Sequence, residues 1–169
     1  MFNYRKEVLN TLVPHFRRDP RYYLLMSDMG FGSIDQLKGE FPDRVINCGI
    51  MEQAATGIAA GMSMSGLIPI FYSIVNFLAF RALEQIRNDI VIQNLNVKLI
   101  GTGADNYFKF LGPSHCCGDD DVKIMRLINM KVYDPYAPRQ ESSAPQQGRN
   151  FAELVDEWIK SDSPGYLRV

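Results

Sequence analysis

Two kinds of hydrophobic pattern alternate along this chain. The first is a short run of consecutive apolar residues bounded by polar residues or glycine, which is typical of a strand buried on both faces of a sheet. The second is a longer segment in which apolar residues recur every three or four positions, which predicts an amphipathic helix. The predicted strands are 22–26, 45–47, 68–72, 97–101, 131–134 and 166–169, and the predicted helices are 3–17, a short one within 31–43, 51–65, 77–93, 119–129 and 150–160.

Strands and helices therefore alternate almost throughout the chain, which predicts one domain of the α/β class over residues 1–169. We expect a three-layer sandwich in which helices cover both faces of a mostly parallel sheet. In such a fold the loops at the carboxyl ends of the strands carry the chemistry. These loops are 27–33, 47–52, 72–77, 101–118 and 134–150, and the Pro-, Gln- and Ser-rich segment 135–150 is predicted to be mobile.

Composition and charge narrow the function classes. A net charge of −1 gives no electrostatic signature of nucleic-acid binding. No apolar run is long enough to cross a membrane, and the first residues lack the hydrophobic region of a signal peptide, so we expect a cytoplasmic protein. The three cysteines, Cys48, Cys116 and Cys117, form no CxxC pair, which argues against a zinc site or a disulfide framework.

One carboxylate occupies an unusual position. Glu52 lies among small and apolar residues, where the predicted strand 45–47 gives way to the predicted helix 51–65. A buried carboxylate without a partner is costly, so Glu52 is a candidate functional residue. A first-turn glutamate that interacts favourably with the helix dipole is the alternative interpretation.

Five sequence blocks indicate a known family. They lie at 41–53, around Glu52; at 76–86; at 93–99; at 112–115, which reads Gly-Pro-Ser-His; and at 165–168, which reads Gly-Tyr-Leu-Arg. In their order and spacing the chain resembles the pyrimidine-binding domain of transketolase-like thiamine diphosphate enzymes. This family includes transketolase, whose C-terminal section the chain is similar to, deoxyxylulose-phosphate synthase and the β subunit of pyruvate dehydrogenase.

The resemblance implies a role for each of five residues. Glu52 matches the carboxyl that hydrogen-bonds N1′ of the cofactor's aminopyrimidine and favours its imino tautomer. Phe77 is the first candidate for the aromatic residue that stacks on the pyrimidine and Phe80 the second, although both also fit core positions of a helix. Arg81 aligns with a basic residue that meets a substrate phosphate in some relatives, or it forms an ion pair with Glu84 or Asp89.

His115 matches the active-site histidine of the family's Gly-Pro-Thr-His motif. Such a residue lies near the substrate carbonyl and exchanges protons near neutral pH. The other histidine, His15, is expected to be an ordinary helix residue. Leu111 stands where many relatives have an aspartate that reads a sugar hydroxyl, which implies a substrate with fewer hydroxyl groups than a common sugar phosphate. Cys116 and Cys117 are expected to be small buried fillers.

The sequence lacks the Gly-Asp-Gly motif with which the family holds the cofactor's diphosphate through Mg²⁺. We therefore expect one subunit of a split enzyme, in which a diphosphate-binding subunit supplies the Mg²⁺ ligands and the complex is a heterotetramer or larger. The resemblance implies transfer of a two-carbon or acyl unit from a ketose or α-keto acid to an aldehyde. The alternatives are a non-catalytic regulatory or interaction module and a β-type component of a keto-acid dehydrogenase.

Overall fold

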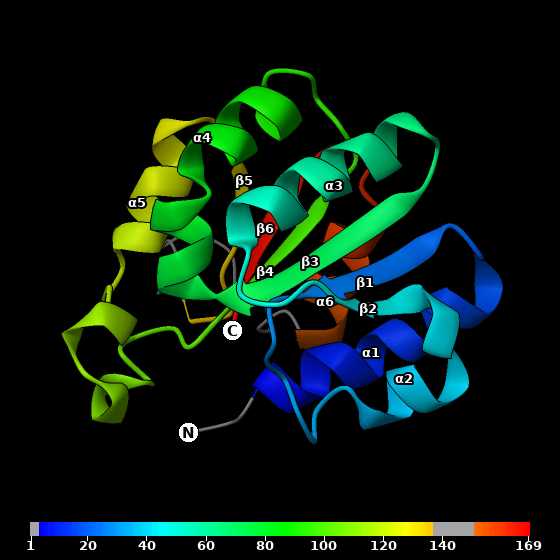
Figure 1. Ribbon diagram of the computed structural model, residues 1–169, viewed down its shortest axis with the longest axis horizontal. Helices are drawn as coiled ribbons and strands as arrows, with labels where there is room; N and C mark the ends of the chain where they lie inside the picture. Colours follow the sequence, from blue (N-terminus) through cyan, green and yellow to red (C-terminus); the bar gives the residue numbers. More distant parts are fainter. Residues whose placement is uncertain (1–3, 137–150) are drawn as a thin grey trace, which may run out of the picture.

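The computed structural model describes residues 4–136 and 151–169 and contains a six-stranded, entirely parallel sheet (Figure 1). The order β2-β1-β3-β4-β6-β5 means that the last strand in the sequence lies inside the sheet, between β4 and β5. In register, Leu25 lies opposite Phe71, and Phe71 lies opposite Leu99. The strands are β1 (Tyr22–Met26), β2 (Val45–Asn47), β3 (Ile68–Ile74), β4 (Lys98–Thr102), β5 (Lys131–Tyr133) and β6 (Gly165–Arg168).

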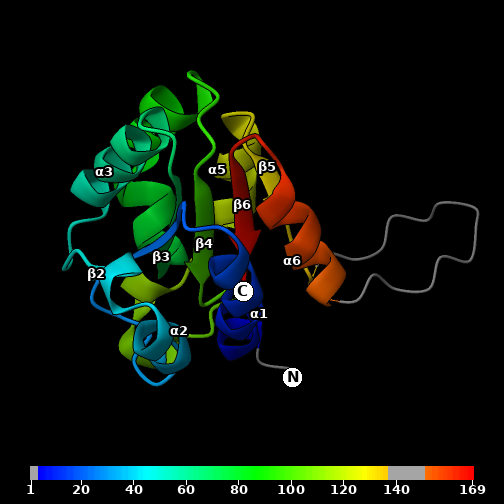
Figure 2. The ribbon, with the colours of Figure 1, turned by 90° about the vertical axis from the view of Figure 1, so that its right-hand side faces the viewer.

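Helices cover both faces of the sheet, as the alternating pattern predicts. One layer contains α1 (Tyr4–Arg18), α2 (Asp35–Glu40) and α6 (Phe151–Lys160), and α1 packs beside α6 (Figure 2). The opposite layer contains α3 (Glu52–Met64), the helical segment 77–91 and α5 (Asp120–Leu127) (Figure 1). A short 3-10 turn, η1 (Pro42–Arg44), leads into β2.

Successive residues of each strand point into different layers of the core. Leu24, Ile70 and Ile100 belong to the cluster packed under α1, α2 and α6, whereas Leu25 and Phe71 belong to the cluster under α3 and segment 77–91. All five side chains are fully buried. This two-sided burial explains why the strand sequences are continuously apolar rather than alternating.

The segment 77–91 differs from the single helix predicted over 77–93. It consists of a π-helical segment η2 (Phe77–Arg81), a short α4 (Leu83–Gln85) and a second π-helical segment η3 (Ile86–Val91). Its fully buried row, Leu78, Ala82, Ile86 and Ile90, recurs every four residues. An α-helix turns every 3.6 residues and would carry this row away from the sheet, whereas wider π turns keep it against the core.

The remaining elements agree with the prediction to within one or two residues at most ends. The three cysteines are unpaired, and Cys117 is buried whereas Cys116 is half-buried. The predicted mobile segment 135–150 lies outside the described residues from position 137 onward. In the ranges 4–136 and 151–169, no helix combines the length and apolar character that a membrane span requires.

Candidate active site

The carboxyl ends of the parallel strands bring the candidate residues to one edge of the sheet. Glu52 opens α3, shortly after β2 ends at Asn47. The Asn47 side chain shapes this connection, because its Oδ1 accepts hydrogen bonds from the backbone N–H groups of Gly49 at 2.9 Å and Asp28 at 3.1 Å. Gly49 has a φ of +70°, which glycine adopts without strain.

Glu52 is a buried carboxylate with two side-chain donors. Only 1% of its surface is exposed. The Ser73 hydroxyl, at the end of β3, donates to Oε1 at 3.3 Å, and the Arg81 guanidinium donates to Oε2 through a close ion-paired contact. Ser73 and Arg81, which come from two other segments, therefore supply the partners that a buried carboxylate needs.

Arg81 also covers an aromatic ring. Its guanidinium carbon lies 4.3 Å from the centroid of the Phe77 ring, which is a cation–π distance. Both residues lie in η2, at its two ends, while the Arg81 side chain remains 40% exposed. Arg81 thus connects the buried carboxylate to the aromatic face and to solvent.

His115 completes the cluster through a contact with Phe77. The two ring centroids are 5.0 Å apart and the planes meet at 75°, an edge-to-face arrangement. His115 lies in the short 3-10 turn η5 (Pro113–His115), and its Nδ1 is 3.0 Å from the Ser114 hydroxyl. The half-buried imidazole is therefore accessible at the edge of the sheet.

The structure brings together four of the five residues singled out from the sequence, in the order Glu52, Arg81, Phe77, His115. Phe80 is not joined to them by any described ring contact, and its side chain is 49% exposed. Arg81 forms its ion pair with Glu52, so the alternative pairing with Glu84 or Asp89 is wrong. The π-helical geometry of η2 accompanies this arrangement, and the sequence pattern carried no sign of it.

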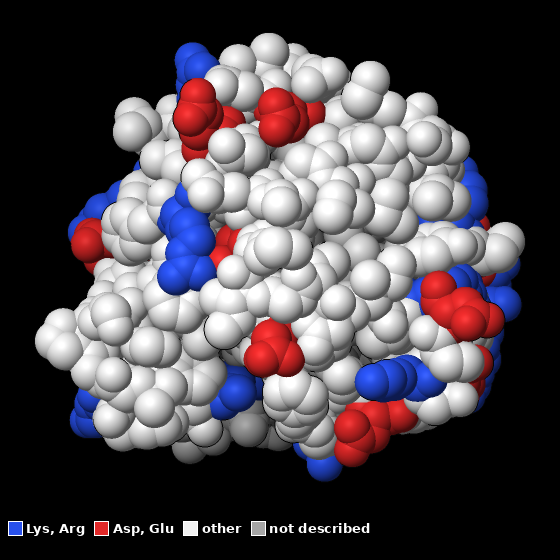
Figure 3. All heavy atoms as spheres, in the orientation of Figure 1, with Lys and Arg blue, Asp and Glu red and all other residues white. Residues whose placement is uncertain are grey.

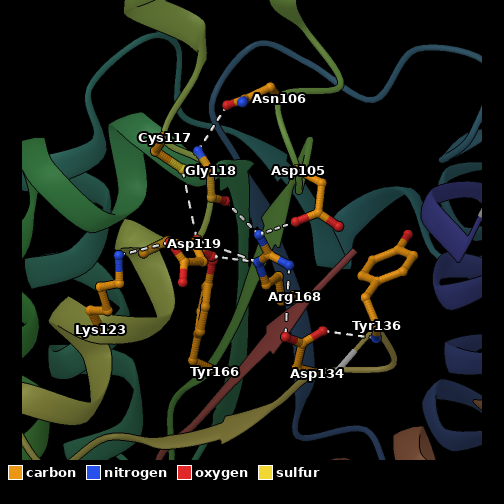
Figure 4. Close-up of polar contacts among 11 residues, drawn as sticks. Asp105, Asn106, Cys117, Gly118, Asp119, Lys123, Asp134, Tyr136, Tyr166 and Arg168 are labelled. Carbon is orange, nitrogen blue, oxygen red and sulfur yellow. Dashed lines mark hydrogen bonds and ion pairs between the residues drawn. The ribbon is translucent and has the colours of Figure 1, made fainter. Parts of the chain in front are cut away.

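Two features of this edge were not anticipated from the sequence. The apolar pattern places Ser73 in the predicted loop 72–77, whereas it lies within β3 near its end and donates a hydrogen bond to Glu52. A second polar network surrounds Arg168 at the end of β6 (Figure 4). A charged residue in an otherwise apolar terminal strand was the available signal for that network.

A buried side-chain oxygen beside the cluster has no hydrogen-bond partner among the described residues. Asn76 directly precedes Phe77, and its Oδ1 is buried without a hydrogen bond among the described residues. In the same described ranges, no three His, Cys, Asp or Glu side chains are grouped as metal ligands. The edge therefore offers a buried carboxylate, an aromatic face and a half-buried imidazole.

Solved structures share this fold. A split-gene transketolase described as an inactive β4 tetramer superposes with a TM-score of 0.77 at 31% identity, covering 97% of this chain and 49% of that chain. The transketolase of Leishmania mexicana has a TM-score of 0.76 at 20% identity, covering 97% of this chain and 24% of its own, which supports the fold alone.

Curated relatives and a family model cover most of the sequence. An apulose-4-phosphate transketolase subunit of Actinobacillus succinogenes is 34% identical over 131 residues, which are 77% of this chain and 39% of that protein. A 6-deoxy-6-sulfo-D-fructose transketolase subunit of Clostridium sp. strain MSTE9 is 29% identical over 167 residues, which are 98% of this chain and 48% of that protein. The chain thus spans less than half the length of each of these relatives.

The family model described as the transketolase pyrimidine-binding domain matches residues 1–163. The match includes the whole edge that carries Glu52, Phe77, Arg81 and His115. From this match and the shared fold, the chain belongs to the transketolase pyrimidine-binding domain family of thiamine diphosphate enzymes.

Proposed function

We propose that residues 1–169 form the pyrimidine-binding domain of a split, thiamine diphosphate-dependent enzyme of the transketolase type. The complex transfers a two-carbon or acyl unit from a ketose or α-keto acid to an aldehyde. The observation that carries this proposal is the buried Glu52 carboxylate beside the Phe77 ring and the His115 imidazole, at the carboxyl edge of the sheet.

Glu52 is the group that holds a proton at N1′ of the aminopyrimidine. When bound, thiamine diphosphate would supply a nucleophilic thiazolium carbon, and the Glu52 carboxyl would favour it through its hydrogen bond to N1′. The burial of Glu52 strengthens this hydrogen bond, because the surrounding apolar residues lower the local dielectric. The Ser73 hydroxyl fixes the second oxygen and so orients the carboxyl.

Arg81 competes with the cofactor for the same carboxylate. The guanidinium bonds Oε2 of Glu52 and lies over the Phe77 face, which are the two surfaces that a pyrimidine ring would use. The Arg81 side chain therefore swings away when the cofactor binds. Because this side chain is long and 40% exposed, that movement requires no change in the core.

Once released, the Arg81 guanidinium is a cation at the mouth of the site. The names of two relatives specify substrates that carry a phosphate or a sulfonate. We assign Arg81 to an anionic group of the substrate and His115 to proton exchange at the substrate carbonyl or hydroxyl. Leu111, in the same loop as His115, is exposed and contributes an apolar side chain rather than a carboxylate.

A second subunit binds the diphosphate and Mg²⁺. Hard cations such as Mg²⁺ take oxygen ligands, and the described residues of this chain group none for the purpose. Two relatives are likewise named as subunits, and a third protein as a split-gene transketolase. The proposed assembly is a heterotetramer or larger.

The outer face of α3 is the surface proposed for this subunit contact. Residues 53–80 contain no charged side chain, and the face over α3 is almost free of charge in Figure 3. Exposed apolar residues on or beside it include Ile50, Met51, Ile58 and Met64. A Cβ added at Gly57 or Gly61 would meet nothing within 4 Å inside the chain, so no neighbour within the chain requires these glycines. Close approach of another subunit provides a reason for them.

The experiment is a calorimetric titration of thiamine diphosphate with Mg²⁺, first into this chain alone and then into its complex with the diphosphate-binding subunit. We expect tight, Mg²⁺-dependent binding only in the complex. Tight binding to the chain alone would contradict the proposed division of the cofactor site, and absence of binding to the complex would contradict the proposed function.

A further inference from the structure

We propose that Arg168 and Asp105 are positioning residues for His115, because the Arg168 guanidinium holds together the two ends of the loop that carries this histidine. The geometry stands by itself, whereas its consequence for catalysis rests on the function proposed above. Among the described residues, no hydrogen bond or ion pair joins either residue to Glu52, Phe77 or Arg81, and the sequence assigned no role to either.

The two ends of loop 105–118 meet at one nitrogen atom. Nη2 of Arg168 donates to Asp105 Oδ1 at 2.8 Å, at the beginning of the loop, and to the Gly118 carbonyl at 2.5 Å, at its end (Figure 4). A second bond crosses the same gap, because the backbone N–H of Gly118 donates to Asn106 Oδ1 at 2.8 Å. The base of the loop is therefore closed by side chains rather than by a ladder of backbone bonds.

The guanidinium that closes the loop is itself fixed. Arg168 ends β6 inside the sheet, and its side chain is only 3% exposed. Its Nε lies 3.1 Å from Oδ2 of the fully buried Asp121, which also accepts a 2.6 Å hydrogen bond from the Tyr166 hydroxyl. Asp134, after β5, lies 3.7 Å away on the third nitrogen. The contacts of Arg168 with Asp105 and Gly118, which we call the clasp, are thus tied to α5 and to two strands.

The carboxylates around Arg168 keep its guanidinium positively charged. Burial by itself would lower the pKa of Arg168, but the carboxylates of Asp121, Asp105 and Asp134 raise it above its ordinary value. Desolvation and the neighbouring Asp121 carboxylate also raise the pKa of the Cys117 thiol to about 12. The guanidinium therefore stays charged, and the thiol stays neutral, at every physiological pH.

His115 lies just before Gly118, close to the clasp. Beyond the clasp, Tyr107 and Phe108 pack against the Arg5 guanidinium of α1, whose carbon lies 4.5 Å and 4.8 Å from the two ring centroids, whereas Phe110 and Leu111 are exposed. His115 lies between these two anchors and nearer in sequence to the clasp, so the position of the imidazole against Phe77 depends on the base of the loop as well as on Phe108. Small displacements matter in such sites, since about 1 Å of misplacement costs up to about 10²-fold in rate.

The chain contains only two histidines, which permits a selective test by NMR of histidine-labelled protein. His15, in α1, lies outside this network and serves as the internal reference. Asp105 has a φ of +52°, which glycine tolerates, so Asp105→Gly removes the carboxylate without straining the backbone. We expect the His115 imidazole signal to shift and broaden in Asp105→Gly, while the His15 signal stays at its wild-type position.

The control is Asn129→Gly, an exposed position with a φ of +63° in the turn before β5, which should leave both signals unchanged. Asp105→Asn keeps an acceptor oxygen for Arg168 and should restore the His115 signal. Arg168→Lys keeps a cation but cannot bridge both ends of the loop, so it should reproduce Asp105→Gly. An unchanged His115 signal in a folded Asp105→Gly or Arg168→Lys chain overturns the proposal.

The assembled enzyme supplies a second readout. Asp105→Gly should lower kcat by about 10-fold through loss of orientation, while the affinity for thiamine diphosphate stays within about 2-fold of wild type. A purely structural role would lower the melting temperature and leave kcat at wild type, which contradicts the proposal. If the wild-type complex fails to bind the cofactor, the proposed function fails, while the NMR result still decides whether the clasp positions His115.

Discussion

Replacement of Arg81 by glutamine tests the competition between this residue and the cofactor. The substitution removes the guanidinium that pairs with Oε2 of Glu52 and covers the Phe77 ring, and it removes nothing from the core. Without the cofactor, Glu52 then keeps only the Ser73 donor at 3.3 Å. We therefore expect two opposite effects, namely a less stable chain and a tighter cofactor complex.

The magnitude follows from the burial of the two partners. Breaking a fully buried ion pair costs about 3–5 kcal/mol, whereas an exposed pair contributes about 0–1 kcal/mol. Here Glu52 is buried and the Arg81 side chain is 40% exposed, which indicates an intermediate value. A cost of about 2 kcal/mol lowers the melting temperature by roughly 4–8 °C in a chain of this size. Because the cofactor no longer has to break the Arg81–Glu52 pair, the same free energy tightens cofactor binding by roughly 30-fold.

The assays are thermal unfolding of the cofactor-free chain and calorimetry of the assembled complex with thiamine diphosphate and Mg²⁺. Arg87→Gln is the matched control, because Arg87 is an exposed arginine of the same helical layer that bonds Asn88 instead. In a Glu52→Gln background, Arg81→Gln should no longer lower the melting temperature. Equal stability and equal cofactor affinity for Arg81→Gln and wild type would refute the competition.

Two further substitutions probe the ring and the subunit surface. Phe77→Ala should weaken cofactor binding to the complex by roughly 2- to 10-fold, since a stacked ring contributes about 0.5–1.5 kcal/mol, whereas Phe80→Ala should not; calorimetry that gives the reverse order would assign the stacking to Phe80. Gly61→Leu should keep the melting temperature of the chain, because a Cβ there meets nothing within 4 Å. The same variant should lose the subunit complex in sedimentation, and unimpaired assembly would exclude this face of α3 as the contact.

The sequence predicted the layers well because burial on a sheet or helix face is recorded in the local spacing of apolar residues. Continuous apolar runs identified the strands of the parallel sheet, and the apolar stripes identified the helices on both faces. Glu52 and His115 could be singled out because each lies in a short, contiguous sequence motif that follows a predicted strand. These predictions needed no knowledge of which strands are neighbours.

The contacts of the site residues could not be predicted, because they join segments that are distant in the sequence. Ser73 and Arg81 come from β3 and η2, and only the fold shows that both donate to one carboxylate. Phe77, rather than Phe80, contacts Arg81 and His115, and it does so within π turns that an α-helical period does not predict. Arg168 joins Asp105, Gly118 and Asp121 only because β6 inserts beside β4, and a linear pattern contains no information on strand order.

The central claim is that Glu52 drives activation of thiamine diphosphate in the assembled enzyme. The most direct measurement is cofactor-dependent turnover of the complex that contains Glu52→Gln, with folding checked by circular dichroism and assembly by sedimentation. The account predicts a folded, assembled complex whose rate falls by about 10²–10⁴-fold, because glutamine cannot exchange the proton at N1′. A rate within about 2-fold of wild type would contradict the account, since an acid–base group of this kind contributes far more.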